Sequence, residues 1–257
     1  EPVAASSDGS FERVIGHSVA IQQTISRARQ LGKSRVPVLL LGETGVGKEV
    51  FARGIHEANA DKSDPFVALN CGGLSRELLS SELFGHAEGS FTGAKRGGMI
   101  GKIEAADGGT LFLDEIGEMP IDLQPHFLRV LEESEVYRLG ENKARKVSFR
   151  LIAATHRDLR SQISDGRFRM DLFYRIAVTS INIPPLRDRA DDIPLLVDHY
   201  LRLLSRQHGL DSVQVTPGVI ELLQHYAWPS NVREFRNVIE NMLLTAGNTL
   251  ITEADLP

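Results

Sequence analysis

Apolar positions are arranged in two different patterns along the first two thirds of the chain, as short continuous runs and as stretches with helical spacing. Short apolar runs at residues 36–41, 65–70, 110–113 and 149–154 have the length and composition of buried strands. Stretches with apolar residues at helical spacing separate these runs, and they begin near Ser18, Lys48, Ser75, Leu123 and Asp158. Strands that alternate with helices predict an α/β fold with a three-layer core around a mainly parallel sheet.

The alternation stops after residue 183, where Pro184 and Pro185 mark a junction. The patterns at 193–207, 217–226 and 231–246 are helical, which predicts a small all-helical second domain. We expect a linker over residues 1–10, an α/β domain over 11–185 and a helical domain over 186–257.

Two connections within the α/β domain are also predicted. Residues 136–139 and 147–154 have the pattern of a hairpin joined by a polar stretch. Glycine occurs too often in residues 85–98 for a packed element, so this segment is expected to project as a loop.

Composition limits the class of protein. The 257 residues are 42% hydrophobic, enough to bury a sizeable core, and the formal net charge of −5 gives no broad basic surface for coating nucleic acid. The single cysteine, Cys71, excludes an intrachain disulfide framework and is expected to be a small buried residue. No apolar run approaches the ~20 residues of a membrane span. We expect a cytoplasmic protein with no membrane partner.

The first apolar run ends in a glycine-rich turn that carries a clear chemical signal. Gly42, Gly45, Gly47 and Lys48 have the spacing of a phosphate-binding loop, in which backbone N–H groups surround phosphate oxygens and the lysine reaches the outer phosphates. The Ser or Thr that normally follows the lysine and binds magnesium is Glu49 here. The alternative is a strand-to-helix turn without nucleotide, and a lysine at this offset disfavours it.

Two acids follow the third apolar run. Asp114 and Glu115 stand at its carboxyl end, where open α/β sheets form their ligand-binding crevice. Nucleotide hydrolysis needs a magnesium anchor and a group that orients the attacking water, and Asp114 and Glu115 fit these two roles. The alternative is a pair of solvated carboxylates, which the phosphate loop at residues 42–49 disfavours.

Eight segments together resemble the central AAA+ ATPase domain of the bacterial enhancer-binding proteins, the activators of sigma-54 RNA polymerase. They are GETGVGKE at 42–49, LNC at 69–71, SELFGHAEGSFTGA at 81–94, GGTLFLDEIGEMP at 108–120, AATHRDL at 153–159, FRMDLFYRI at 168–176, PPLRDR at 184–189 and WPSNVREF at 228–235. The similarity spans residues 11–250. GSFTGA is the most specific segment, because this loop, usually G-A-F-T-G-A, is a hallmark that other AAA+ ATPases lack.

The resemblance implies ATP and Mg²⁺ as ligands, and it makes Glu49 the family's usual residue after the loop lysine. Asn70 would hold the catalytic glutamate away from water until a partner is engaged. Thr155 would sense the γ-phosphate, while the adjacent His156 is expected to be only structural. The residues implied to contact nucleotide are Val14 and Ile15 beside the adenine, Gly42, Glu43, Thr44, Gly45, Val46, Gly47, Lys48 and Glu49 in the loop, and Arg233 in the helical lid.

Arg169 and Arg175 match the family's pair of arginines that act on the ATP of a neighbouring protomer. Arginine in this role stabilises charge on the transferring phosphoryl group. The active site would then be completed between protomers, which implies a ring, by resemblance a hexamer. The alternative is that the two arginines form solvated ion pairs on the surface.

The loop implied to engage sigma-54 is Gly89, Ser90, Phe91, Thr92, Gly93 and Ala94. An exposed phenylalanine and threonine between glycines can be raised or withdrawn at little cost. Ser90 replaces the family's alanine and adds a hydroxyl, from which we expect tuned coupling at most. The basic residues 143–146 fall in what resembles the family's second, assisting loop. The alternatives are a Phe91 that packs back on the core and a solvated hairpin tip.

We therefore interpret the chain as an ATP-hydrolysing AAA+ domain that moves the 89–94 loop to remodel sigma-54 RNA polymerase. One alternative is a module that assembles on ATP but barely hydrolyses it. Another is a different AAA+ remodeller, against which the 89–94 loop argues. The chain looks like an excised central domain, so DNA binding is expected from a separate C-terminal domain.

Overall fold

The computed structural model describes residues 9–58, 63–89, 98–210, 213–245 and 250–257. The chain divides into two compact units. The helical unit comprises residues 1–27, 42–51 and 182–257, and the sheet unit comprises residues 28–41 and 52–181. The helices α1 (Val19–Gly32) and α2 (Lys48–Glu57) contribute residues to both units. The predicted domain boundaries at residues 10 and 185 stay predictions.

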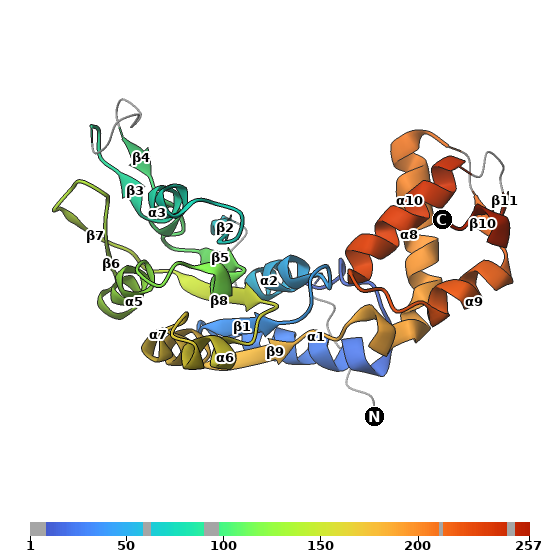
Figure 1. The fold of residues 1–257 in the computed structure, drawn as a ribbon, viewed down its shortest axis with the longest axis horizontal. Coiled ribbons are helices and arrows are strands. Elements are labelled where there is room, and N and C mark those ends of the chain that lie inside the picture. The colour runs from blue at the N-terminus through green and yellow to red at the C-terminus, as the bar shows by residue number, and fades with distance from the viewer. Residues whose placement is uncertain (1–8, 59–62, 90–97, 211–212, 246–249) are drawn as a thin grey trace. The chain divides into compact units, whose positions relative to one another are not determined.

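A five-stranded sheet forms the centre of the sheet unit (Figure 1). Its strands lie in the order β2-β5-β8-β1-β9, with bounds β1 (Val38–Leu41), β2 (Phe66–Asn70), β5 (Thr110–Asp114), β8 (Arg150–Thr155) and β9 (Thr179–Asn182). β2, β5, β8 and β1 pair in parallel. Every residue of β8 is buried, as expected for a parallel strand covered on both faces. The predicted parallel α/β core is confirmed.

The helices of the sheet unit begin and end close to their sequence signals. They are α3 (Arg76–Phe84), α4 (Lys102–Ala105), α5 (Gln124–Glu133), α6 (Leu159–Ser164) and α7 (Met170–Ile176). The Ser75 hydroxyl accepts a hydrogen bond from Leu78 N and caps α3, which typically contributes about 1 kcal/mol. Gly85 ends the same helix at a φ of 77°. α4 was not predicted, because a single turn carries too short a pattern.

A buried arginine at the start of the central strand β8 binds the ends of two helices. Arg150, 4% exposed, donates to the carbonyl oxygens of Leu31 (2.7 Å), Gly32 (3.0 Å) and Ile55 (3.3 Å). Leu31 and Gly32 are the last residues of α1, where a cation complements the helix dipole. Burial lowers the pKa of Arg150 to about 10, which still leaves it charged at neutral pH.

Two small hairpins stand at the same end of the sheet unit (Figure 1). β3 (Gly85–His86) pairs with β4 (Met99–Ile100), and β6 (Glu135–Tyr137) pairs with β7 (Ala144–Lys146), both antiparallel. Backbone hydrogen bonds from Ala87 N to Leu139 O and from Leu139 N to Gly85 O, each 2.9 Å, join the two hairpins.

Two predictions about these hairpins are wrong. Gly85 and His86 are buried in a strand, although they were assigned to an unpacked loop. The strand after β6 is 144–146, whereas most of residues 147–154 belongs to β8 in the central sheet. The sequence Ala-Arg-Lys has no apolar face, so the hairpin is held by backbone pairing that leaves no hydrophobic signal.

The C-terminal part of the helical unit follows its predicted pattern closely. After η2 (Leu186–Asp192) come α8 (Ile193–His208), α9 (Pro217–His225) and α10 (Asn231–Thr245). Trp228, Phe235 and Ile239 pack in their shared core. A short parallel pair, β10 (Gln214–Val215) with β11 (Leu250–Ile251), and the turn η3 (Glu253–Asp255) complete the region.

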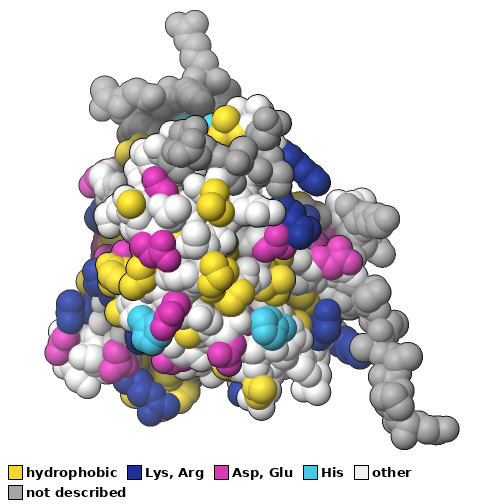
Figure 2. All heavy atoms as spheres, turned by 90° about the vertical axis from the view of Figure 1, so that its right-hand side faces the viewer, with side chains coloured by type: hydrophobic (Ala, Val, Ile, Leu, Met, Phe, Trp, Pro, Cys, Tyr) yellow, Lys and Arg dark blue, Asp and Glu magenta, His cyan; other side chains and the backbone are white. Residues whose placement is uncertain are grey.

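The surface contains charges of both signs. On the face drawn in Figure 2, acidic and basic side chains are interspersed, in keeping with the net charge of −5. In the part of the chain that the structure describes, none of the helices combines the length and the apolar character that crossing a membrane would require.

Candidate functional site

Polar side chains gather where the parallel strands end. β2 ends at Asn70, β5 at Asp114 and β8 at Thr155, and Glu115 directly follows β5. Asn70 lies opposite Asp114 in the register, and Thr155 lies opposite Leu41, the last residue of β1. The carboxyl ends of parallel strands share one edge, which is where open α/β sheets bind ligands. The sheet therefore brings these predicted site residues together.

The backbone at Glu115 turns sharply out of the strand. Its φ of 52° and ψ of 48° lie in the left-handed region, which costs a non-glycine residue about 1 kcal/mol. The turn η1 (Ile116–Glu118) holds this geometry through a 2.9 Å hydrogen bond from Glu118 N to Glu115 O. A Cβ on Gly117 would be 3.1 Å from Thr155 Oγ1, so the turn packs closely on the end of β8.

His156 contacts the carboxylate of Glu115. The Oε2 atom of Glu115 lies 2.7 Å from His156 Nδ1 and 3.3 Å from His156 N. The expectation of a purely structural His156 did not include this contact. The available signal was its position immediately after Thr155, at the edge shared with Asp114 and Glu115.

Asn70 lies close to the same glutamate. Its Oδ1 accepts a 2.7 Å hydrogen bond from Gly72 N. A Cβ on Gly72 would be 3.2 Å from Asn70 Oδ1 and 3.8 Å from Glu115 Cβ, so both side chains lie next to Gly72. This proximity suits the predicted hold of Asn70 on Glu115, which stays a prediction.

The phosphate loop belongs to the helical unit and has the backbone that its glycines allow. Gly45 and Gly47 have φ values of 80° and 101°, which other residues rarely adopt. A Cβ on Gly45 would be 2.1 Å from Ser230 O and 3.1 Å from Arg233 Cβ, so the N-terminus of α10 sits against the loop. Lys48, 7% exposed, donates from Nζ to Gly42 O (3.0 Å) and Glu43 O (3.3 Å). The ammonium group that is predicted to bind phosphate is thus bonded to the loop itself.

Glu43 is bound to residues of the C-terminal region. Its carboxylate accepts hydrogen bonds from Arg187 (2.6 and 2.8 Å) and from Asn231 Nδ2 (3.1 Å). The hydrogen bond from Arg187, followed by that from Asn231, lowers the pKa of Glu43 to about 2. The buried Asn231 also donates to Thr44 O (3.1 Å) and accepts from Leu186 N (2.7 Å). We call Glu43, Arg187 and Asn231 the loop anchor.

The loop anchor was not foreseen, because three residues from distant segments form it. Glu43 was predicted only as a nucleotide contact, and that role stays a prediction. A carboxylate repels phosphate, so the side chain of Glu43 suits a structural tie better than a ligand contact, while the loop N–H groups suit phosphate.

Val14 and Ile15 border a small cavity of about 60 Å³ within the helical unit. The other lining residues are Arg13, Val46, Gly47, Val50, Phe51, Arg189, Leu196, Tyr200 and Val232. The cavity adjoins the phosphate loop at Val46 and Gly47 and is mainly apolar, but ligand pockets usually have about 300–1,000 Å³, so the adenine contacts of Val14 and Ile15 stay a prediction.

A buried carboxylate fixes the segment that follows Ile15. Asp192 accepts hydrogen bonds from His17 N (2.6 Å), Ser18 N (2.7 Å) and Ser18 Oγ (2.8 Å). These donors lie at the N-terminus of α1, where a negative charge is favourable. A Cβ on Gly16 would be 2.6 Å from Asp192 Oδ2, so glycine is needed for this close approach.

The predicted trans-acting arginines are engaged within their own chain. Arg169, the N-cap residue of α7, forms a bidentate pair with Asp171 at 2.6 and 3.0 Å, and this contact lowers the pKa of Asp171. Arg175 donates to Leu131 O at 2.7 Å. Both side chains are exposed at the surface of the sheet unit, so their action on a neighbour stays a prediction.

The predicted sigma-54 loop lies largely outside the described residues. Of its positions, Gly89 is described and exposed with a φ of 73°, whereas Ser90, Phe91, Thr92, Gly93 and Ala94 lie outside. The described strands β3 and β4 form the base from which the loop leaves. Glu104, just after β4, forms a bidentate ion pair with Arg138 in the second hairpin at 2.8 and 2.9 Å.

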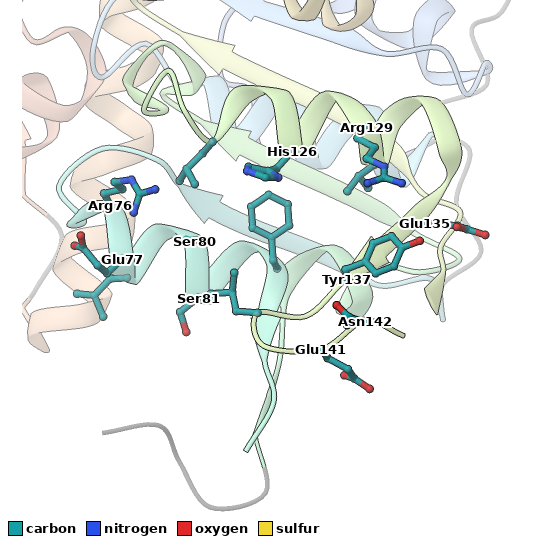
Figure 3. A pocket seen from close by; sticks show the side chains of 15 residues that line it. Arg76, Glu77, Ser80, Ser81, His126, Arg129, Glu135, Tyr137, Glu141 and Asn142 are labelled. Atoms are coloured by element: carbon teal, nitrogen blue, oxygen red, sulfur yellow. The ribbon is translucent and has the colours of Figure 1, made fainter. Parts of the chain in front are cut away.

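A separate groove of about 830 Å³ runs between α3 and α5 in the sheet unit (Figure 3). Phe84, Leu123 and Val130 form part of its wall, and Arg129 lies over the ring of Tyr137 at 5.4 Å. None of the predicted nucleotide or catalytic residues lines this groove.

Among the described residues, Asp114 could bind a magnesium ion whose other ligands come from a bound nucleotide and from water. No cluster of three His, Cys, Asp or Glu side chains suited to holding a metal occurs among them. Magnesium in phosphate-transfer sites is usually held by one or two carboxylates together with phosphates and water. Asp114 at the end of β5 satisfies this donor set only together with a bound phosphate.

The sheet, the glycine loop after β1 and the acids after β5 define a phosphate-loop nucleotide-binding protein. Residues 14–182 match the family model of the sigma-54 interaction domain, and residues 187–257 match that of the AAA+ ATPase lid domain. The chain therefore belongs to the sigma-54 interaction domain family. The predicted resemblance and the AAA+ fold with a helical lid are confirmed.

Curated relatives cover nearly all of this chain. It is 46% identical to the transcriptional regulatory protein ZraR of Salmonella typhimurium over 95% of the chain and 55% of that protein. It is 47% identical to the Nif-specific regulatory protein of Herbaspirillum seropedicae, over 95% of the chain and 45% of that protein. A protein named limonene hydroxylase from Geobacillus stearothermophilus is 50% identical over 92% of the chain and 44% of that protein. The chain thus spans about half the length of these relatives.

Solved structures of NtrX from Brucella abortus have the same fold. The complex of NtrX with ADP superposes with a TM-score of 0.89 at 32% identity, covering 97% of this chain and 56% of NtrX. The complex with ATP gives a TM-score of 0.86 at 32% identity, covering 95% and 54%.

Proposed function

We propose that this chain binds ATP and hydrolyses it, and that the cycle remodels sigma-54 RNA polymerase. The observation that carries the proposal is the edge formed by Asn70, Asp114, Glu115 and Thr155 in a chain of the sigma-54 interaction domain family. The ADP and ATP complexes of NtrX support the choice of nucleotide.

Each part of the phosphate chemistry has a residue suited to it. The backbone N–H groups of residues 42–47 and the Lys48 ammonium would bind the phosphates, at the N-terminus of the ten-residue helix α2. Asp114 would hold magnesium, which neutralises charge that develops on the phosphate oxygens. Glu115 would accept the proton of the attacking water, and Thr155 would sense the terminal phosphate.

The adenine and the lid complete the ATP contacts. Val14 and Ile15 offer apolar surface beside the loop, and their cavity also takes in Arg189 and Tyr200. Arg233 lies in the first turn of α10, close to Gly45, which suits a sensor of bound nucleotide. The loop anchor would transmit lid position to the phosphate loop.

A neighbouring protomer in a ring would complete the active site. The family resemblance implies that this ring is a hexamer. Arg169 would have to leave Asp171, and Arg175 would have to leave Leu131 O, before either could reach the neighbour's ATP. Both contacts are solvent-exposed, so exchanging them costs little.

The 89–94 loop would be the part that engages sigma-54. The two joined hairpins offer a route by which movement at the nucleotide edge could reach this loop, because the chain runs from Glu115 through η1 and α5 into β6, and Leu139 after β6 bonds to Gly85 and Ala87. A Thr92→Ala variant should bind purified sigma-54 weakly while releasing phosphate at the rate of the unchanged chain. Unchanged binding of sigma-54 would remove the loop from this role.

Phosphate release tests the proposed enzyme. Specific activity of the purified chain should rise with protein concentration as protomers assemble, and Glu115→Ala should bind ATP without turnover. The control Glu132→Ala changes an exposed acid on α5, away from this turn, and should keep most of the activity. Equal, slow release by the unchanged chain and by Glu115→Ala would instead favour a module that assembles on ATP without hydrolysing it.

A further inference from the structure

A buried glutamine at the start of α5 contacts the segment that carries Arg169. Gln124 is fully buried, and its side chain makes three hydrogen bonds. Its Nε2 donates to Met119 O at 2.9 Å and to Arg167 O at 3.1 Å, and its Oε1 accepts from Arg169 N at 2.8 Å. All three partners are backbone groups, one just before α5 and two just before α7.

Both ends of the amide are needed for these contacts. A glutamine side chain has two N–H donors and one oxygen acceptor, so its three partners fix the direction in which the amide points. An apolar side chain of the same size would fill the space and leave buried backbone groups without partners. Residue 124 is therefore determined by its hydrogen bonds as well as by its packing.

A second buried glutamine holds the same segment. The backbone oxygen of Gln162 accepts hydrogen bonds from Arg167 N (2.8 Å) and Phe168 N (3.2 Å), and its side chain donates to Gly117 O at 3.1 Å. The side chain of Phe168 is buried in the core of the sheet unit. The backbone that leads into Arg169 is thus fixed on its inner side, while the side chain of Arg169 is exposed.

α5 holds both ends of α7. Gln124, the first residue of α5, bonds to the backbone of Arg169 at the start of α7, and Leu131 O on α5 accepts from Arg175 in its last turn. α7 has no side-chain cap of its own at Arg169. The contact with Gln124 therefore fixes where the helix begins.

The contact with Gln124 is the one that can persist during action on a neighbour. Arg169 would have to leave Asp171, and Arg175 would have to leave Leu131 O, so both side-chain ties would be lost. The hydrogen bond from Arg169 N to Gln124 uses the backbone and does not compete with that movement. A catalytic group that is misplaced by about 1 Å can cost about 100-fold in rate, so a fixed backbone matters at this step.

We infer that Gln124 is a positioning residue, which holds the start of α7 so that Arg169 reaches the ATP of a neighbouring protomer. The inference rests on the proposed function and deepens it, because it assigns Gln124 to the active site of the neighbour. The rival role is in its own protomer, where the bond to Met119 O ends the turn that follows Glu115.

The first test is steady-state phosphate release by purified Gln124→Met, whose side chain has a similar size but cannot make the three hydrogen bonds. Arginine supplied in trans stabilises the transition state of phosphoryl transfer. Its misplacement should lower kcat by about 10- to 100-fold and leave KM for ATP nearly unchanged. Gln124→Met should cause little further loss when Arg169 is already Ala, because the group that it positions is gone.

Mixed rings show in which protomer Gln124 acts. Glu115→Ala has no turnover of its own but presents Arg169 normally, whereas Gln124→Met keeps Glu115 and presents Arg169 poorly. In a head-to-tail ring one neighbour supplies arginine to each site, so a 1:1 mixture should release phosphate at about a quarter of the rate of the unchanged chain, far above either variant alone. Arg169→Ala mixed with Glu115→Ala is the positive control. Gln162→Met, which loses a second buried amide but keeps the acceptor of Arg169 N, should gain nothing from the same mixing.

The outcomes separate this inference from the proposed function. The inference alone is overturned if Gln124→Met keeps full kcat, if it gains nothing from mixing although Arg169→Ala does, or if Gln162→Met gains as much. Absence of Glu115-dependent release in the unchanged chain, or no gain for Arg169→Ala, would overturn the proposed function and this inference with it. Gln124→Asn, which is one methylene group shorter and cannot reach all three partners, takes the place of Gln124→Met in each test if the latter does not fold.

Discussion

The loop anchor leads to a quantitative prediction for the stability of the helical unit. Asn231 is fully buried, has a φ of 54° and makes hydrogen bonds with Leu186 N, Thr44 O and Glu43. We expect Asn231→Ala to lower the free energy of unfolding of this unit. The substitution removes all three hydrogen bonds and places alanine in a left-handed conformation.

The size of the effect follows from the surroundings of each group. The buried Leu186 N–H, left without its acceptor, costs about 1.5 kcal/mol. Thr44 and Glu43 are more exposed, and water can replace the lost donor, so together they add about 0.5–1 kcal/mol. Alanine at this φ adds about 1 kcal/mol. The expected loss is about 3 kcal/mol.

Urea unfolding followed by tryptophan fluorescence measures this loss. Trp228 is the only tryptophan, lies in the core of the helical unit and donates from Nε1 to Leu223 O at 2.7 Å. The control Asn231→Gly accepts the same φ and should be about 1 kcal/mol more stable than Asn231→Ala. A loss below about 0.5 kcal/mol in Asn231→Ala, or a glycine variant as stable as the unchanged chain, would refute the reasoning.

Three further predictions concern titration, burial and reactivity. The pKa of Glu43 is about 2 in the folded chain, against an ordinary 4.5. The stability that its carboxylate contributes is therefore present above pH 4.5 and lost as the pH falls through 2. Glu43→Gln should be less stable than the unchanged chain above pH 4.5, and acid unfolding should show the two stabilities converging as the pH falls from 4.5 to 2. Arg150→Met should lower stability by about 3 kcal/mol in thermal unfolding, because three carbonyls lose a charged donor, and an unchanged midpoint would contradict this. Burial raises the pKa of Cys71 to about 12, so a thiol reagent at pH 8 should label the chain only after unfolding, and rapid labelling of the folded chain would contradict the assigned burial.

The sequence predicts well those elements whose apolar pattern is long or whose ends are marked by a capping residue, a glycine or a charged residue. β5 ends at its predicted acids because an apolar run is followed directly by Asp114 and Glu115. α3 starts at the Ser75 cap and stops at Gly85, two residues whose local chemistry acts without distant partners. α10 begins at Asn231, where its helical pattern also starts, although the side chain of Asn231 bonds to distant residues.

Elements that depend on distant partners could not be predicted in this way. The polar strand β7 is paired through its backbone and has no apolar face, so the sequence pattern favours the more hydrophobic residues 147–154 as the second strand of the hairpin. Gly85 and His86 form a strand only because Met99 and Ile100 return beside them. Short strands of this kind carry no periodic signal.

The candidate site likewise contains residues that local sequence patterns predict and contacts that depend on distant parts of the chain. Lys48, Asp114 and Glu115 are found from spacing because each stands at the end of a strand or loop. The contact of His156 with Glu115 and the tie between Glu43, Arg187 and Asn231 join residues far apart in the chain, 41 positions for His156 and Glu115 and 188 for Glu43 and Asn231. Only the folded backbone reveals such pairs.

Open-complex formation by sigma-54 RNA polymerase on a promoter is the most direct measurement of the central claim. With ATP, the unchanged chain should produce open complexes. Glu115→Ala should produce none because it cannot turn ATP over, and Thr92→Ala should produce none although it still releases phosphate. Vigorous phosphate release by the unchanged chain without any open complex would contradict the claim that this ATP cycle acts on sigma-54 polymerase.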